Sequence, residues 1–179
     1  MRILPFFLVT IALSCVPKIE KGPVPIEEAA KPVQVIEMQD VNSPNLYLHA
    51  IIHAGSSKDP VGKEGLAHLT GQALVGAGAG EFGPEQLRKR LYPTGNQFKL
   101  TVERDYVTLR IRCHKDHGDL CIGSFLDVLT QPKFEETSVE RLREEALYNV
   151  TDGILSDEEA LGDAVLNGLL FEGHPYGHP

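Results

Sequence analysis

The fold of this 179-residue chain is decided by one stretch, His53-Ala54-Gly55-Ser56-Ser57-Lys58-Asp59-Pro60-Val61-Gly62-Lys63-Glu64-Gly65-Leu66-Ala67-His68-Leu69-Thr70-Gly71-Gln72. Residues 47–54 lead into it with an alternation that is typical of a half-buried strand. One side of that strand carries Leu48, Ala50, Ile52 and Ala54, and the other carries Tyr47, His49, Ile51 and His53. A loop with glycine and proline follows, and a helix is expected from Gly65 to Leu74. The stretch therefore predicts a strand, a loop and a helix in that order.

The predicted helix invites comparison with the zinc motif H-x-x-E-H. That motif places two imidazoles on one helix face, with a carboxylate before the second imidazole that activates water. Here His68 occupies the first position, Gly71 the position of the carboxylate, and Gln72 the position of the second imidazole. Glycine has no side chain, and a neutral amide is a poor zinc ligand beside imidazole or carboxylate. The helix thus lacks most of the chemistry of a zinc helix.

Three segments together resemble one family, the pitrilysin/insulinase or M16 metallopeptidases. Residues 53–69 resemble the strand, loop and helix that open the N-terminal module of that family. Val128-Leu129-Thr130-Gln131-Pro132-Lys133-Phe134 resembles the end of a later helix, and Gly173-His174-Pro175-Tyr176-Gly177 resembles a recurrent loop near the end of the first subdomain. The resemblance is collinear over residues 33–179 and implies a module of the pseudo-peptidase type.

The remaining elements predict an α+β fold. Strands are expected at Val33–Met38, at residues 96–102 and at residues 106–113, and helices at residues 84–91 and 119–129. Two capping boxes, Thr137–Glu140 and Ser156–Glu159, predict helices that run to Val150 and Leu170. We therefore expect an antiparallel sheet with helices packed on one face. The resemblance implies the M16/LuxS-like metalloenzyme fold, incomplete at the C-terminus because the module of the family continues with further strands.

The resemblance also implies a third zinc ligand, a Glu about 77 residues after the second imidazole. Counting from Gln72 leads to Asn149, so His68 is the only one of the four positions that is retained. Glu145 lies one helical turn earlier on the same face and would be a ligand only if the alignment slips. A site of His68 and Glu145 would still lack a general base and a closed ligand set. We therefore expect no catalytic residues and no cofactor, with zinc implied only if such a site survives.

A second cluster, Cys113-His114-Lys115-Asp116-His117-Gly118-Asp119-Leu120-Cys121, joins a predicted strand to a predicted helix. Its spacing fits no familiar structural zinc pattern. A disulfide between Cys113 and Cys121 and a pair of free thiols are both compatible with the sequence, and a metal knuckle is a third alternative.

The N-terminus resembles a bacterial lipoprotein signal. Residues 1–15 begin with Arg2, continue with a short apolar run and end at Cys15, which lipid would modify. Residues 16–32 are rich in proline and predict a flexible tether before a domain of residues 33–179. We expect attachment to the bacterial cell envelope facing the periplasm, with ordinary secretion as the alternative.

The formal net charge of −8 argues against a nucleic-acid surface. The expected function is a non-catalytic M16-like subunit, exported and membrane-tethered, that binds a peptide, an active zinc-bearing M16 partner, or both. One alternative is a divergent zinc metalloendopeptidase that uses His68 and Glu145. Another is a stand-alone exported binding domain.

Overall fold

The computed structural model describes residues 33–95 and 97–177. The chain divides into two units, residues 1–39 and residues 40–179. In the described part of the first unit, residues 33–39, no helix or strand forms, so the predicted strand Val33–Met38 is wrong. Val33, Val35 and Met38 are 83–90% exposed. A strand requires a neighbour that accepts its ladder hydrogen bonds, and alternation of apolar side chains alone does not supply one. The predicted signal, the tether and Cys15 lie outside the described residues.

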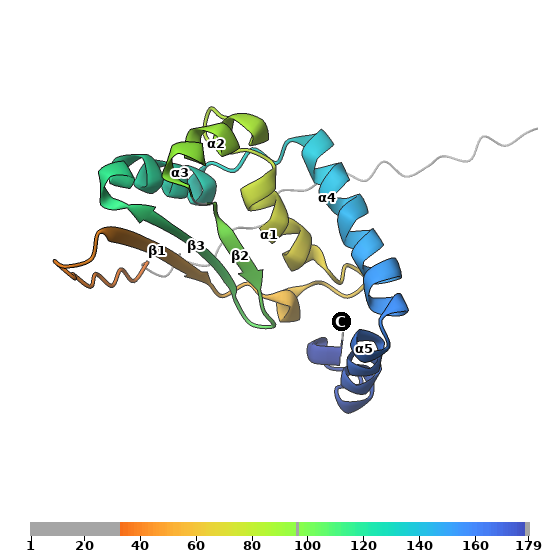
Figure 1. Ribbon diagram of the computed structural model, residues 1–179. Helices are drawn as coiled ribbons and strands as arrows, with labels where there is room; N and C mark the ends of the chain where they lie inside the picture. The colour runs from red at the N-terminus through yellow and green to blue at the C-terminus, as the bar shows by residue number, and fades with distance from the viewer. Residues whose placement is uncertain (1–32, 96, 178–179) are drawn as a thin grey trace, which may run out of the picture. The chain divides into compact units, whose positions relative to one another are not determined.

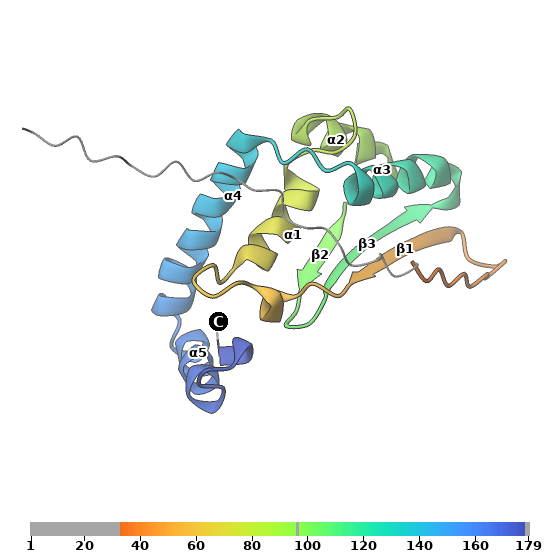
Figure 2. The same cartoon turned by 180° about the vertical axis from the view of Figure 1, so that it is seen from behind.

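The second unit is an α+β layer, as expected (Figure 1). Its strands are β1 (Asn45–Ile52), β2 (Lys99–Val102) and β3 (Val107–His114), and they form an antiparallel sheet in the order β1-β3-β2. Its helices are α1 (Leu66–Gly76), α2 (Pro84–Leu91), α3 (Gly118–Thr130), α4 (Glu136–Tyr148) and α5 (Glu158–Leu170). Both ribbon views place α1, α2 and α3 on the same side of the sheet (Figures 1 and 2). Within the described residues, no helix is both long and apolar enough to span a bilayer.

The core lies between this side of the sheet and the helices. Strand pairing sets Leu48 opposite Ile111, and Ala50 opposite Leu109. Because residues directly opposite each other share a face, these side chains point together toward the helices. They pack against side chains of α2 and α3, which are Leu87, Leu91, Cys121, Phe125 and Val128. The alternation predicted for residues 47–54 is confirmed as far as Ile52, where β1 ends. The strand predicted at residues 106–113 is β3, in which Leu109 is fully buried.

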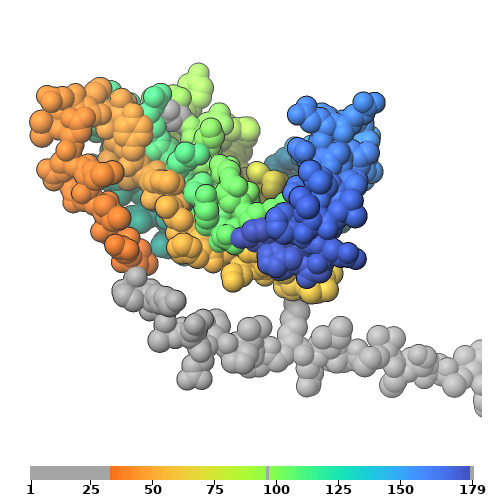
Figure 3. Space-filling model, turned by 90° about the horizontal axis from the view of Figure 1, so that it is seen from below, coloured from red at the N-terminus to blue at the C-terminus, as the bar shows by residue number. Residues whose placement is uncertain are grey.

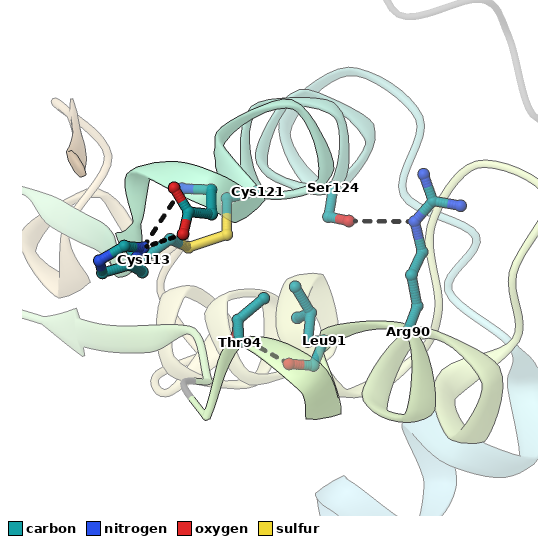
Figure 4. Close-up of a disulfide and its surroundings, with 8 residues drawn as sticks. Arg90, Leu91, Thr94, Cys113, Cys121 and Ser124 are labelled. Carbon is teal, nitrogen blue, oxygen red and sulfur yellow. Dashed lines mark hydrogen bonds and ion pairs between the residues drawn. A yellow bond between two sulfur atoms is a disulfide. The ribbon is translucent and has the colours of Figure 1, made fainter. Parts of the chain in front are cut away.

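Cys113 at the end of β3 and Cys121 in α3 are joined by a disulfide bond (Figure 4). Their Cα atoms are 6.6 Å apart, and both residues are at most 1% exposed. One turn further along α3, the buried Ser124 hydroxyl accepts a hydrogen bond of 3.3 Å from Arg90 Nε of α2. The guanidinium of Arg90 also lies 4.5 Å from the centre of the Phe82 ring. These contacts hold α2, α3 and β3 together.

The two predicted capping boxes do not start their helices. Helix α4 begins at Glu136 after an N-cap at Glu135 that makes no side-chain cap. Helix α5 is capped by Asp157, whose carboxylate accepts hydrogen bonds from the backbone N–H groups of Glu159 and Ala160. A carboxylate is at least as good an N-cap acceptor as a hydroxyl, so Asp157 prevails over its neighbour Ser156. Between these two helices the backbone forms a π-helical segment, Asn149–Ile154.

Candidate functional site

Helix α1 forms the floor of a groove whose walls come from two parts of the chain. Figure 3 shows the hollow between α4 (blue) and the α2–β2 region (green), with α1 (yellow) at its base. A pocket of about 450 Å³ opens at the C-terminal end of α1. It is lined by residues of α1, α2 and α4 and of the segment before β2, among them Val75, Leu87, Phe98, Ser138 and Arg141.

The beginning of α1 is fixed by an acidic residue from the preceding loop. The N-cap is Gly65, which has a φ of 91° and offers no side-chain cap. Instead the Asp59 carboxylate accepts hydrogen bonds from the backbone N–H groups of Gly65 and Ala67, each at 2.8 Å. A carboxylate at this position satisfies two unpaired donors and also favours the positive end of the helix dipole. The capping role of Asp59 was not predicted, although no Ser, Thr, Asp or Asn stands immediately before Leu66, which indicates that the cap comes from elsewhere.

Gly71, the position of the missing carboxylate, is buried against the sheet. A Cβ atom placed there would lie 2.9 Å from Leu100 Cδ2 and 3.0 Å from Val102 Cγ2. Both side chains belong to β2 and point toward the helices. Because Gly71 has no Cβ atom, α1 packs against β2 at a distance at which a larger residue would force Leu100 and Val102 to shift.

The opposite side of α1 packs on α4. Leu142 of α4 packs with Ala73 of α1 and with Ala77, the C-cap of α1, and a Cβ at Gly76 would be 3.2 Å from Leu142 Cδ1. His68 and Gln72 share a helix face because they are four residues apart. At 3.6 residues per turn this face lies between the side toward α4 and the side toward β2. His68 is exposed and Gln72 is half-buried.

The two positions considered for the third ligand lie at the end of α4. Glu145 is exposed and forms an ion pair of 3.0 Å with Arg141. Asn149 is also exposed and is the first residue of the π-helical segment. Within residues 33–95 and 97–177 there is no group of three or more His, Cys, Asp and Glu residues that would hold a metal ion. The structure thus brings the two helices together without assembling a ligand set.

Hydrogen bonds to Asp105, in the turn between β2 and β3, connect this turn to the loop after α5 and to the loop after β1. The Tyr176 hydroxyl donates a hydrogen bond of 2.6 Å to Asp105, and the Ser57 hydroxyl donates one of 3.2 Å to the same carboxylate. The bond from Tyr176 is the main cause that lowers the pKa of Asp105, and the bond from Ser57 and the charges of Lys58 and His174 lower it further. The same bond raises the pKa of Tyr176. These residues are far apart in the sequence, and no local pattern predicts their contact.

The chain matches the family model of insulinase, peptidase family M16, over residues 34–174. Because this match covers most of its length, the chain belongs to the M16 peptidase family. The resemblance seen in the sequence is thereby confirmed. No curated protein matches the chain significantly.

Among solved structures, the unit resembles the crystal structure of a peptidase M16 inactive domain from Pseudomonas fluorescens, with a TM-score of 0.68 and 23% sequence identity. The match covers 77% of this chain and 33% of that chain, so this chain spans about a third of the length of the protein it resembles. At this identity the likeness establishes the fold.

Proposed function

We propose that this chain is a non-catalytic member of the M16 family that acts by binding. The observation that carries the proposal is Gly71. Zinc hydrolysis in this family of motifs needs a carboxylate one residue before the second imidazole. Here that position has no side chain, and a Cβ atom placed there would lie 2.9 Å from Leu100 Cδ2 and 3.0 Å from Val102 Cγ2, which is closer than van der Waals contact. Gln72 and Asn149 further reduce the ligand set to His68.

What such a protein would bind is an extended peptide. Strand β2 lies at an edge of the sheet, since the strand order is β1-β3-β2. Residues 99–102 can therefore add a peptide strand through backbone hydrogen bonds, while the groove above α1 receives alternate side chains. The half-buried Phe98 and the nearby Leu87 give that groove an apolar wall. The similar structure from Pseudomonas fluorescens is an inactive M16 domain, and this supports the proposal that the fold can be retained without catalysis.

The first test is the metal content of the purified full chain after exposure to zinc near neutral pH. We expect less than stoichiometric zinc by elemental analysis, and no loss of metal on His68→Ala. One zinc ion per chain that disappears in His68→Ala would overturn the proposal and favour a divergent metallopeptidase.

We also propose export, attachment through a lipid on Cys15, and association with an active zinc-bearing M16 subunit. The buried disulfide supports export, because such bonds persist in oxidising compartments. Palmitate labelling of cells should be abolished by Cys15→Ser, and a protein that remains soluble in the periplasm would contradict the lipid anchor.

The partner is tested by purification from the native cells and by peptide hydrolysis with and without this chain. We expect an intact H-x-x-E-H protein to co-purify and its activity to fall when this chain is removed. If the active protein works equally well alone, the chain is a stand-alone binding domain.

A further inference from the structure

The sheet has a second face, turned away from the helices, that no described helix covers. Pairing places Tyr47 opposite Arg112, and His49 opposite Arg110. Arg110 also pairs with Lys99 of β2 on its other side. Residues that are directly opposite share a face, so these side chains form one surface across all three strands. We call this surface, Tyr47, His49, Ile51, Lys99, Arg110 and Arg112, the outer sheet face.

The outer sheet face is cationic in a chain whose net charge is −8. None of the outward positions of the three strands carries an acidic residue. Lys99, Arg110 and Arg112 are exposed, and none of them forms an ion pair with any residue that the structure describes. Like charges opposite each other destabilise a sheet, so the row formed by Lys99 and Arg110 has an electrostatic cost that this unit does not offset.

The same face is also apolar in part. Tyr47 is 65% exposed and Ile51 is 57% exposed. They lie on either side of His49 along β1, and Tyr47 is directly opposite Arg112, so apolar side chains lie beside cationic ones on this face. Surfaces that combine exposed aromatic residues with arginine are typical of the centres of protein interfaces.

We infer that the outer sheet face binds an acidic amphipathic helix of a partner protein. Neighbouring strands lie about 4.8 Å apart, so three strands span roughly 10 Å, which is about the diameter of one helix. Glu or Asp side chains of that helix would pair with Arg110, Arg112 and Lys99, and its apolar stripe would cover Tyr47 and Ile51. This surface is on the opposite side of the sheet from the groove above α1, so the inference goes beyond the proposed function.

A protein helix fits this surface better than an anionic membrane. The chain carries a net charge of −8, and an extended bilayer would lie close to more of its acidic residues than a single helix does. Screening at physiological ionic strength limits the influence of distant acidic residues to about 8 Å. The flat sheet also offers a narrow strip and not a protruding basic segment that would enter the headgroup layer.

The test uses the full chain and a synthetic helical peptide with Glu on one face and Leu on the other, titrated by fluorescence anisotropy. We expect saturable binding that weakens with added salt, and no binding of the same peptide with Lys in place of Glu. The double change Arg110→Glu and Arg112→Glu should weaken binding by about tenfold or more, because it sets like charges against each other. Arg110→Gln with Arg112→Gln should give a smaller loss and serves as a second variant if the first does not fold.

The matched control is Lys63→Glu in the loop before α1 together with Arg143→Glu on α4. It changes the net charge by the same amount but alters cations that lie neither on the outer sheet face nor in the groove above α1, and Arg143 is already paired with Glu140. Binding should be unchanged in this control. Equal losses in both double variants, or no peptide binding at all, would overturn the inference. Binding to phosphatidylglycerol vesicles that depends on Arg110 and Arg112, without binding to the peptide, would overturn it in favour of a membrane surface.

Discussion

The β3–α3 block, residues 107–130, and helix α5 show two opposite ways in which this chain treats apolar side chains. In the block, Leu109, Val128, Cys113 and Cys121 are at most 1% exposed, and a disulfide links its two elements. Helix α5 has no buried residue at all, and Leu169 and Leu170 are 72% and 67% exposed. Both segments are rich in apolar residues, so composition does not distinguish them. The difference lies in whether a second layer covers the apolar side chains.

The buried side chains of the block therefore contribute more to the free energy of unfolding of the unit than the exposed side chains of α5 do. Burial of apolar surface is the largest favourable contribution to folding, and an exposed leucine contributes little of it. Helix α5 is held chiefly by its N-cap at Asp157 and by the loop that carries Tyr176. Substitutions in the block and at its border should therefore lower the free energy of unfolding more than substitutions in or near α5.

The largest effect is expected from a cavity at the centre of the sheet. Leu109→Ala should lower the free energy of unfolding by about 2–5 kcal/mol, since it removes a fully buried side chain from a packed core. Leu169→Ala in α5 should change it by no more than about 0.5 kcal/mol. Urea denaturation followed by circular dichroism measures both. Similar losses in the two variants would show that α5 is as well covered as the block.

The next effect concerns the crosslink of the block. Replacing both Cys113 and Cys121 by Ala should cost about 2–3 kcal/mol, because the bond closes a loop with a sequence separation of 8 and restricts the unfolded chain. The comparison is made by denaturant unfolding of this variant and of the oxidised wild type. A variant as stable as the wild type would mean that packing alone holds the junction. Reduction of the wild type should require unfolding, because both sulfur-bearing residues are buried.

A smaller loss is expected where α1 meets β2, the strand that pairs with β3 of the block. Gly71→Ala adds a Cβ within 3.0 Å of Leu100 and Val102, and we expect a loss of about 1–3 kcal/mol from overpacking. Gly123→Ala is the matched control, since a Cβ on this helical glycine of α3 meets nothing within 4 Å. That substitution should stabilise by about 0.5–1 kcal/mol through the better helix propensity of Ala. If Gly71→Ala stabilises the protein to the same extent, α1 does not approach β2 closely.

The smallest effect concerns the junction that holds the loop after α5. Tyr176→Phe removes the hydrogen bond that is the main cause of the lowered pKa of Asp105. A carboxyl group with a lowered pKa in the folded state stabilises the protein above the pKa of the unfolded chain, about 3.9, and loses that contribution as the pH falls below it. The stability difference between wild type and Tyr176→Phe should therefore be present at pH 7 and shrink toward pH 3. A difference that does not change with pH would mean that the ring packing of Tyr176 matters and its bond to Asp105 does not.

Much of the fold was predictable because its signals are local. Side-chain periodicity and turn residues predicted the alternation in residues 47–52, the strand at residues 106–113 and the helix at residues 84–91, and the structure confirms them. The strand at residues 33–38 and the capping boxes were predicted by equally local signals and are wrong. A strand needs a neighbouring strand, and the sequence pattern does not show which segment pairs with it. At a helix N-terminus several adjacent side chains can accept the same backbone hydrogen bonds, and the sequence does not show which one does.

Some features of the candidate site could likewise be predicted from the sequence, and others depend on tertiary contacts. The loss of the carboxylate at Gly71 and of imidazole at Gln72 is a statement about residue identity, so the sequence by itself determines it. The Asp59 cap of α1, the bond between Asp105 and Tyr176, and the contact of Gly71 with β2 depend on which segments meet. The pairing of Cys113 with Cys121 was one of several possibilities until the strand end and the helix start were placed.

The sequence by itself therefore determined the family, the order of most elements and the chemistry that is missing from α1, because each of these is encoded in neighbouring residues. Only the tertiary structure decided that Gly71 lies against Leu100 and Val102, and that the outer sheet face gathers its cations into one surface. The physical reason is distance along the chain. Contacts between residues tens of positions apart are fixed by the packing of whole layers, and no local periodicity specifies which layers meet.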